Sequence, residues 1–356
     1  MKVLHIITCV ADSGGSEKLM EDLLPGLRRQ GIDISCLVFN GFDSQNRRLL
    51  EKEGIKVYEL GHNAHYYNPL FFFKLIPYLR RFDIVHAHNT PAVLFTALSG
   101  LFGTAHLVMT VHSAEGKLRN FWWGRLIDKW IYRHFGTIIC CSSIAEQNLL
   151  KEYPFLKDKT ITINNGVNLS KFIDASPSKE ILENADKRVT MVARFRKEKN
   201  HMALIDALKF LPDAFHVFFV GDGDTKNACE MYACDCQVAQ RVHFLGLRTD
   251  VPSILKASDY IVLSSRFEGL SLSSIEGMAA GKPFIASDVN GLREVVGGAG
   301  VLFPEGDGKS LAEVIIDLET NPKKYLDIAK QCAERAMQYS ISNMIAGYRE
   351  VYLRIE

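Results

Sequence analysis

The chain has 356 residues, which is more than one compact hydrophobic core usually serves and fits two domains of ordinary size. Its 42 lysines and arginines nearly balance its 41 aspartates and glutamates, so the basic excess typical of general nucleic-acid-binding proteins is missing. With 47% hydrophobic and 23% charged residues, the composition is that of a globular protein, and nucleic acid is not an expected partner.

Neither the cysteines nor the apolar segments indicate export or a membrane span. The eight cysteines are widely spread and no secretory signal accompanies them, which favours a reducing compartment and predicts a cytoplasmic protein. The apolar start, 3–10, is followed at once by Asp12 and two glycines, so it predicts a buried first strand and not a signal peptide. The uncharged stretch 92–111 is interrupted by glycines and a histidine, which favours a buried helix followed by a buried strand.

Short β-branched runs alternate with longer amphipathic stretches, as in βαβ units that build a parallel sheet. The alternation pauses over a polar stretch at 169–187, which predicts a linker. Helices are expected between the strands, for example at 16–30 and 71–81. Strands are predicted before the pause at 3–8, 33–38, 56–60, 84–87, 106–111, 137–141 and 160–163. After the pause they are predicted at 188–193, 216–220, 242–244, 260–263 and 283–286.

The simplest architecture for this pattern is of the α/β class, with two Rossmann-like, doubly wound domains that face a central cleft. The first domain is predicted to cover residues 1–170 and the second 171–339. A last helical stretch follows, and we expect the segment 340–356 to pack back against the first domain. Ligands of open α/β sheets bind beyond the carboxyl ends of the strands, so the loops there are the places to search for function.

The loop after the first predicted strand carries a pair of glycines. Gly14 and Gly15 let a phosphate or a sugar approach the backbone, and the N-terminus of the following helix favours an anion. The dinucleotide fingerprint is incomplete, because no third glycine follows at the required spacing. A tight strand-to-helix turn without a ligand is the alternative interpretation.

The second domain begins with a strand that is predicted to end near Ala193. Arg194 and Lys199 then lie on the loop above it. An arginine fork and a lysine ammonium group suit a diphosphate. An ordinary solvated loop is the alternative on these residues alone.

The segment 264–283 carries the most specific pattern. A strand ends, a glycine turn follows, a short helix begins near Leu272, and Gly281 ends it. Free backbone N–H groups at the start of such a helix can hold phosphate. The carboxylates of Glu268 and Glu276 can accept hydrogen bonds from vicinal hydroxyl groups, as the acidic residue of nucleotide-binding folds does for ribose. One loop could therefore hold a sugar, a diphosphate and a ribose in line.

Glu268 and Glu276 form the Glu-x7-Glu pattern of the large retaining glycosyltransferase family four, also called group 1, which has the two-domain GT-B fold. The chain resembles this family over most of its length. Further matching segments occur in the same order and spacing, at 14–17, 86–89, 110–112, 165–168, 220–223 and 242–281.

The resemblance implies roles for single residues. Arg194 and Lys199 match the pair that neutralises the donor diphosphate, and Glu276 matches the ribose-binding glutamate. Glu268 matches the glutamate that faces the hydroxyl groups of the donor sugar, and His112 matches a histidine beside that sugar. Further donor-binding positions, mostly backbone groups, are implied at Gly14, Gly15, Leu247, Gly269, Leu270, Ser271 and Leu272.

Three positions depart from the family pattern, and none of them removes a charged residue. Ser271 stands where a second glycine is frequent, so contacts to sugar or phosphate can differ there. Asn168 stands where the linker motif often has aspartate, and Ala193 stands where glycine is common. The predicted activity class is unaffected.

No metal or other cofactor is expected, because the basic pair and the helix amides could stabilise the departing diphosphate themselves. Asp222 and Asp224 spell the Asp-x-Asp pattern of metal-dependent glycosyltransferases, but in a segment that the family uses as a turn. The cysteines between 229 and 236 match no ordinary zinc spacing. His86 and His88 alternate at a strand end, where one is expected to face the core and His88 to reach the cleft.

The acceptor is expected against the first domain, and a glycan, a lipid-linked molecule and a small molecule all remain open. The segment 117–133 combines three tryptophans and five basic residues with the single acid Asp128 on a helical period. That composition suits an interfacial helix on anionic lipid. The preferred interpretation is an ordinary helix with its tryptophans packed inside, with peripheral membrane contact as the alternative.

Together with these residues, the family resemblance implies a retaining, metal-independent hexosyltransferase of cell-surface polysaccharide or glycoconjugate biosynthesis. It would be cytoplasmic, or peripheral at the inner face of the membrane, and would use a nucleotide-diphosphate sugar. The alternatives are another GT-B enzyme, such as a nucleotide-sugar epimerase, and a non-catalytic nucleotide-sugar-binding protein.

Overall fold

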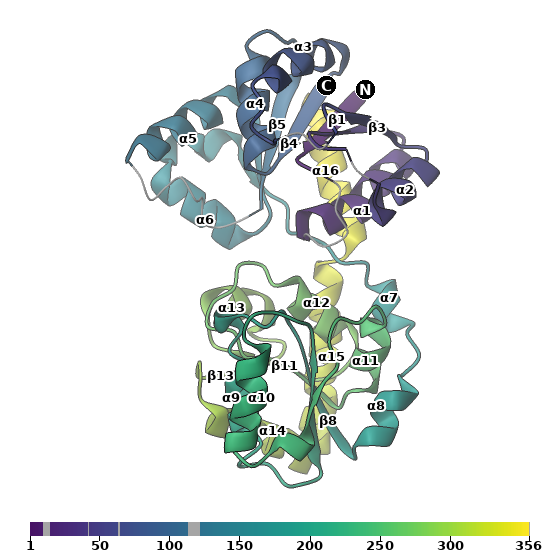
Figure 1. The fold of residues 1–356 in the computed structure, drawn as a ribbon, viewed down its shortest axis with the longest axis vertical. Helices are drawn as coiled ribbons and strands as arrows, with labels where there is room; N and C mark the ends of the chain where they lie inside the picture. Colours follow the sequence, from purple (N-terminus) through teal and green to yellow (C-terminus); the bar gives the residue numbers. More distant parts are fainter. Residues whose placement is uncertain (10–14, 42, 63–64, 113–121, 356) are drawn as a thin grey trace. The chain divides into compact units, whose positions relative to one another are not determined.

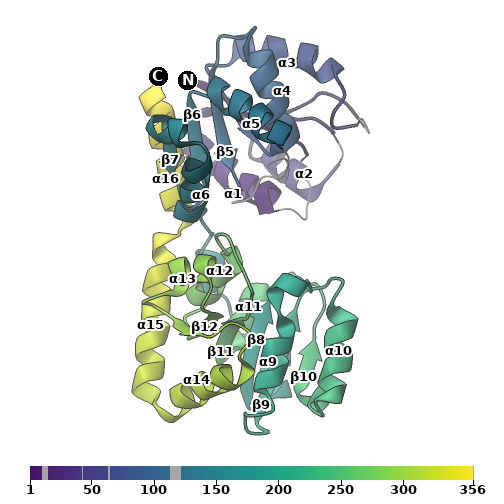
Figure 2. The same cartoon turned by 90° about the vertical axis from the view of Figure 1, so that its left-hand side faces the viewer.

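The computed structural model describes residues 1–9, 15–41, 43–62, 65–112 and 122–355, and Figures 1 and 2 show its ribbon. The chain divides into two compact units, which are described separately. Unit 1 comprises Met1–Gly166 together with Ile341–Glu356, and unit 2 comprises Val167–Ser340.

Unit 1 is built on a parallel sheet of seven strands in the order β3-β2-β1-β4-β5-β6-β7. The chain runs outward from β1 in one direction, returns, and continues outward from β4, so the switch point lies between β1 and β4. The strands are β1 (Lys2–Ile7), β2 (Asp33–Val38), β3 (Lys56–Glu59), β4 (Ile84–His88), β5 (His106–Val111), β6 (Thr137–Cys140) and β7 (Thr160–Thr162).

Helices cover both faces of this sheet, and a separate apolar core lies on each face. One core is formed with α3 (Leu70–Arg81), α4 (Thr90–Gly100), α5 (Trp122–His134), α6 (Ser143–Glu152) and the short helix η2 (Pro154–Lys159). The other is formed with α1 (Gly15–Arg29), α2 (Gln45–Lys52) and α16 (Ile341–Ile355).

The C-terminal helix α16 belongs to unit 1 although it follows unit 2 in the sequence. Its buried residues Met344, Ile345, Tyr348, Val351 and Tyr352 recur at the spacing of one helical face. Figure 1 draws α16 alongside α1, and the two helices meet closely at Gly26. A Cβ atom at that glycine would lie 2.2 Å from the Cδ1 atom of Ile345. The absent side chain lets the two helices approach.

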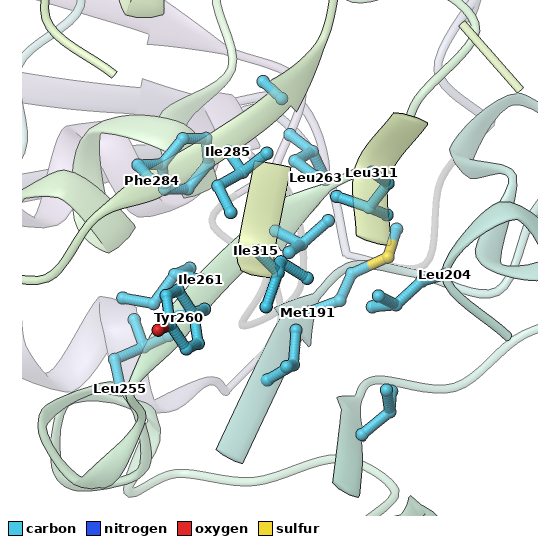
Figure 3. Close-up of a cluster of buried hydrophobic side chains, with 14 of the residues drawn as sticks. Met191, Leu204, Leu255, Tyr260, Ile261, Leu263, Phe284, Ile285, Leu311 and Ile315 are labelled. Atoms are coloured by element: carbon cyan, nitrogen blue, oxygen red, sulfur yellow. The ribbon is translucent and has the colours of Figure 1, made fainter. Parts of the chain in front are cut away.

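Unit 2 is a second parallel sheet, of six strands in the order β10-β9-β8-β11-β12-β13. Its switch point lies between β8 and β11, by the same reasoning. Figure 3 shows part of its main core, where Met191, Ile261 and Ile285 from three strands meet Leu311 and Ile315. The strands are β8 (Lys187–Val192), β9 (Phe215–Val220), β10 (Val242–Phe244), β11 (Tyr260–Leu263), β12 (Phe284–Ser287) and β13 (Val301–Phe303).

The helices of unit 2 lie between its strands and after them. Figure 2 shows α15 as a long helix beside α12 and α13. The helices are α7 (Ser170–Ile173), α8 (Lys179–Asn184), η3 (Lys197–Lys199), α9 (His201–Ala207), α10 (Lys226–Asp235), η4 (Ala239–Arg241), α11 (Val251–Ala257), α12 (Leu272–Ala279), α13 (Asn290–Val296), α14 (Gly308–Thr320) and α15 (Pro322–Gln338).

The predicted α/β class with two doubly wound sheets is confirmed. The polar stretch 169–187 is not a plain linker, because it contains α7 and α8, which both contact α11. The apolar stretch 92–111 is a helix followed by a strand, as predicted. None of the described helices combines the length and the apolar character needed to cross a membrane.

Candidate active site

Two of the loops singled out in the sequence flank the switch point of unit 2. The first follows β8 and carries Arg194 and Lys199, and the second follows β11 and carries Glu268. Since β8 and β11 are hydrogen-bonded neighbours, their carboxyl ends place the two loops side by side. This is the edge of an open α/β sheet where ligands bind.

Lys199 and Glu268 form an ion pair across the two loops. The same carboxylate oxygen, Oε1 of Glu268, also accepts a hydrogen bond of 2.7 Å from the hydroxyl group of Ser265. The two charged side chains are only 21% and 11% exposed. Water therefore screens the pair weakly, and the two opposite charges hold each other in a fixed place.

The backbones of the two loops are also bonded to each other. The hydroxyl group of Ser264 donates to the carbonyl oxygen of Asn200 at 2.9 Å. The amide of Arg266 donates to the carbonyl oxygen of Glu198 at 2.8 Å. Asn200 turns the chain into α9 in the left-handed conformation, with φ of 49°. The positions of Lys199 and Glu268 are therefore set by backbone bonds as well as by their own pairing.

Arg194 is exposed and lies on a loop that rests on the turn after β9. The amide of Phe195 donates to the carbonyl oxygen of Asp222 at 3.0 Å. Gly221 and Gly223 have φ of +142° and +150°, and a Cβ atom on Gly221 would lie 2.1 Å from the carbonyl oxygen of Ala193. The glycines of the segment 220–223 thus let the turn support the arginine loop at close range.

The helix α12 begins directly behind Glu268. The carbonyl oxygen of Ser271 accepts the amides of Ser274 and Ile275, so the amides of Leu272 and Ser273 precede the first intrahelical bond. The side chain of Ser271 does not cap the helix. These amides can receive an anion, and the helix dipole favours negative charge there.

The turn at Glu268 and Gly269 is backed by the start of α13. A Cβ atom on Gly291 would lie 2.1 Å from the carbonyl oxygen of Gly269. Only a residue without a side chain lets α13 approach this backbone. Glu276 lies in α12 and is partly buried, one turn beyond the helix start.

Leu247 follows β10 and is 79% exposed. It comes directly after Gly246, whose φ is +67° and whose carbonyl oxygen accepts the amide of Gly221 at 2.8 Å. The turn that presents Leu247 is thereby bonded to the turn that supports Arg194. An exposed apolar side chain in this position suits contact with the face of a nucleotide base.

Two known protein families match the two halves of the chain. The family described as "Glycosyltransferase Family 4" matches residues 13–171, and the family described as "Glycosyl transferases group 1" matches residues 172–336. The chain belongs to the group 1 glycosyltransferases of family four. The resemblance inferred from the Glu-x7-Glu pattern is therefore confirmed.

Named relatives agree with this family. The glycosyltransferase is 29% identical over 294 residues to UDP-Gal:alpha-D-GlcNAc-diphosphoundecaprenol alpha-1,3-galactosyltransferase of Escherichia coli, covering 77% of this chain and 76% of that one. It is 31% identical over 212 residues to N,N'-diacetylbacillosaminyl-diphospho-undecaprenol alpha-1,3-N-acetylgalactosaminyltransferase of Campylobacter jejuni, covering 56% of each chain.

The fold agrees as well. The crystal structure of HepE of Anabaena in complex with UDP superposes with a TM-score of 0.85 at 22% identity, covering 99% of this chain and 100% of that one. The predicted GT-B fold of the glycosyltransferase is confirmed.

In unit 1 the site residues implied by the family are His112, Gly14 and Gly15. His112 follows β5 and is partly buried. Its Nε2 atom lies 3.0 Å from the Nδ1 atom of His88. Burial lowers the pKa of His112 to about 4, so its ring is neutral at pH 7. Gly15 is the first residue of α1, and Gly14 lies outside the described residues.

The expectation that His88 reaches the cleft is wrong, because His86 and His88 are both fully buried. The two residues are two positions apart in β4, so they lie on the same face of the strand, and their rings stack with centroids 4.3 Å apart. A central strand is covered on both faces, so this shared face is buried too. His5 carries no motif that singles it out in the sequence, and its place beside His86 follows from the pairing of β1 with β4.

Within the described residues, His5, His86 and His88 are the only group of side chains with ligand atoms close enough together to hold one metal ion. All three are buried and their ring nitrogens take part in hydrogen bonds. Asp222 and Asp224 are exposed, and Asp222 accepts the amide of Gly223 at 2.9 Å. That contact is typical of a turn.

Proposed function

We propose that this glycosyltransferase transfers a sugar from a nucleotide-diphosphate sugar with retention of anomeric configuration and without a metal ion. The observation that supports this most is the Lys199–Glu268 pair at the switch point of unit 2, which joins the loop of Arg194 to the loop that leads into α12. Two cations and a helix start suit the two phosphates, and a carboxylate suits sugar hydroxyl groups.

The chemistry follows from where charge develops. When the bond between the anomeric carbon and the diphosphate oxygen breaks, negative charge grows on the departing diphosphate. Arg194, Lys199 and the amides of Leu272 and Ser273 would stabilise that charge from positions fixed before the reaction. The acceptor hydroxyl would attack from the face that the diphosphate leaves and would give its proton to a departing phosphate oxygen. Attack from that face retains the configuration.

The acceptor in this proposal is a lipid-linked sugar of cell-surface glycan biosynthesis, used at the cytoplasmic face of the membrane. The names of the Escherichia coli and Campylobacter jejuni relatives both mention a sugar that is attached to diphosphoundecaprenol. HepE was crystallised with UDP and with UDP-glucose, which supports a uridine nucleotide as the first donor to test.

Binding of the donor is tested by thermal unfolding with UDP, GDP, ADP and their sugars. At 100 times the dissociation constant, a bound nucleotide adds about 2.7 kcal/mol. For a unit of this size that is roughly 5–10 °C in unfolding temperature. We expect one nucleotide family to give this shift, and Arg194→Ala and Glu276→Gln to abolish most of it.

Arg196→Ala is the matched control, because Arg196 is an exposed arginine of the same loop whose salt bridge is to Glu198 at 3.8 Å. It should keep the shift. Absence of any shift with every nucleotide would contradict the donor proposal. A shift without transfer to any acceptor would favour the non-catalytic alternative, and conversion of the nucleotide sugar without acceptor would favour an epimerase.

The outer face of α5 supports the lipid-linked acceptor. Leu126, Ile127 and Trp130 are exposed there at 58%, 38% and 36%, so Trp130 is not packed inside as preferred from the sequence. The cations of Lys129 and Arg133 lie beside them, 5.9 and 5.5 Å from the ring of Phe155. An apolar stripe flanked by cations suits the surface of an anionic membrane. Residues 117–121 of the predicted segment lie outside the described residues.

We expect the protein to co-sediment with vesicles that contain anionic phosphatidylglycerol, and the double variant Leu126→Ser/Trp130→Ser to bind them at least about tenfold more weakly, because apolar area is lost from the contact. Phe73→Ser is the control, since Phe73 is 66% exposed but lies on another helix, α3. Equal loss in both variants, or equal binding to uncharged vesicles, would count against a membrane face on α5.

A further inference from the structure

A row of buried polar side chains crosses the middle of unit 1 and is not accounted for by donor binding. It includes His5 on β1, His86 on β4 and Thr110 on β5, and two tyrosines of α16, Tyr348 and Tyr352. Each is at most 2% exposed. Buried polar groups are costly unless they are hydrogen-bonded, so their partners need to be followed one by one.

These side chains form one continuous hydrogen-bonded chain that ends at His112. Every link joins a ring nitrogen or a hydroxyl oxygen to the next side chain. The links, in order, are Tyr348 Oη to Thr110 Oγ1 at 3.2 Å, Thr110 Oγ1 to His86 Nε2 at 2.7 Å, His86 Nδ1 to Tyr352 Oη at 2.5 Å, Tyr352 Oη to His5 Nε2 at 3.1 Å, His5 Nδ1 to His88 Nε2 at 2.9 Å, and His88 Nδ1 to His112 Nε2 at 3.0 Å.

The hydrogen bonds along this row of side chains can be donated in one of two directions. A neutral histidine has one N–H donor and one bare nitrogen acceptor, and His5, His86 and His88 use both nitrogens. If one ring donates toward His112, the next must do so too. A hydroxyl group that accepted from both of its neighbours would leave its own buried O–H without a partner in this hydrogen-bonded chain, which is costly. With every hydroxyl group donating, all donors point toward His112, or all point toward Tyr348.

The end at Tyr348 decides between the two directions. If all donors pointed toward Tyr348, Thr110 would donate to its oxygen, and the buried O–H of Tyr348 would need another acceptor. Among the described residues, the hydrogen-bond partner of the Tyr348 hydroxyl group is Thr110. A buried donor without an acceptor is costly. The favoured direction therefore starts with Tyr348 donating to Thr110 and ends with His88 donating to the Nε2 atom of His112.

We propose that this chain positions His112, holding its neutral ring as the Nδ1–H tautomer so that it offers a hydrogen-bond donor beyond the carboxyl end of β5. His5, His86, His88, Tyr348 and Tyr352 act as positioning residues. This inference rests on the proposed function for one point only, which is that the oxygen receiving the Nδ1–H bond belongs to the donor sugar. The C-terminal helix α16 thereby takes part in arranging a site residue that is 240 positions earlier in the sequence than Tyr352.

A metal ion at His5, His86 and His88 is the competing use of the same nitrogens. It would need bare nitrogens that now face Tyr352, Thr110 and one another. An ion would therefore break the chain instead of completing it. Metal analysis of the purified protein belongs to the test below.

The tautomer of His112 can be measured directly by nuclear magnetic resonance on protein with ¹⁵N-labelled histidine rings. Two-bond couplings distinguish Nδ1–H from Nε2–H, and the His112→Gln variant identifies the signals of His112. We expect a single Nδ1–H form in the unaltered protein. The Tyr352→Phe substitution removes the O–H group that donates to His5. The direction of donation through His5 and His88 is then no longer fixed, so both tautomers of His112 should be present.

Tyr153→Phe is the matched control, because Tyr153 is a buried tyrosine of the same unit outside the chain. It should leave the tautomer of His112 unchanged. If Tyr352→Phe does not fold, His5→Phe breaks the chain at the next link and should mix the tautomers in the same way. An Nε2–H form in the unaltered protein, an unchanged Nδ1–H form in the broken chain, or a stoichiometric bound metal would each overturn the proposal.

We expect kcat/KM to fall about ten- to hundredfold in Tyr352→Phe. Removing the hydrogen-bond partner that orients a functional histidine has an effect of this size in metal sites, where it has been measured. The two readouts separate the two proposals. If the tautomer responds but the unaltered protein transfers no sugar, the positioning chain stands and the proposed function fails. If sugar is transferred and the tautomer does not respond, the reverse holds.

Discussion

Replacing Lys199 with methionine is expected to lower kcat/KM for sugar transfer by about a thousandfold. Methionine keeps much of the length and apolar character of the stem but removes the ammonium group. A fixed group that stabilises developing charge is worth about 10²–10³ in rate. In addition, the substitution leaves Glu268, only 11% exposed, without its counter-charge where the diphosphate must bind. Both effects act against the anionic donor.

The two effects can be separated with a double variant. Lys199→Met/Glu268→Gln removes both charges, so any loss that comes only from the stranded carboxylate should be recovered. If Lys199 also neutralises the diphosphate, the double variant should stay at least about a hundredfold below the unaltered protein. Rates are measured with saturating acceptor and varied nucleotide sugar.

Lys197→Met is the matched control, because Lys197 is exposed and lies in the same short helix, η3. It should retain nearly full activity. A similar fall for Lys197→Met, or a Lys199→Met variant within threefold of the unaltered protein, would mean that Lys199 does not carry the charge of the donor.

The sequence predicted the elements that hold this site well, because their signals are local. The strands 242–244 and 260–263 and the start of α12 at Leu272 were each marked by a β-branched run or a glycine turn. Since ligands of open α/β sheets bind beyond their strands, the loops with Lys199 and Glu268 could be selected from order alone. Their meeting in one ion pair depends on β8 lying beside β11, which only the topology supplies.

The features that were missed depend on contacts between segments far apart in the sequence. His5 and Tyr352 carry no motif, and their hydrogen bond joins positions 5 and 352 through the packing of α16. The exposure of Trp130 could not be inferred either, because an amphipathic period does not say which part of a helix the neighbours cover. The strand β13, at Val301–Phe303, was not predicted, and it is defined by its pairing with β12, a contact that the sequence does not show.

Lowering the pH from about 7.5 to 5 is expected to destabilise unit 1 by about 4 kcal/mol through His5 and His112 alone, about 2 kcal/mol for each. Burial lowers the pKa of His5 to about 3 and that of His112 to about 4. Burial, together with repulsion from neighbouring rings, also lowers the pKa of His86 and His88 well below the ordinary value of 6.5. The loss from His5 and His112 alone approaches the whole stability of a marginally stable domain, and protonation of unfolded His86 and His88 adds to it.

The sign follows from where the protons bind. Below about pH 6.5 the unfolded chain takes up a proton at each of these histidines, whereas in the folded chain His5 and His112 take up almost none until about pH 4. Acid therefore favours the unfolded chain. The stabilisation is fully present above pH 6.5 and is lost progressively as the pH falls toward 4.

Urea unfolding followed by tryptophan fluorescence measures this loss for unit 1, since Trp122, Trp123 and Trp130 are the three tryptophans of the chain and all belong to that unit. The slope of unfolding free energy against pH is the decisive quantity. His5→Phe removes one of the four groups, so between pH 6 and 4.5 its slope should be shallower by about 1.4 kcal/mol per pH unit, whatever its stability at pH 7.5. Tyr153→Phe should keep the slope of the unaltered protein. If His5→Phe keeps it too, His5 is already protonated in the folded state at these pH values, and the neutral chain of rings that leads to His112 does not exist.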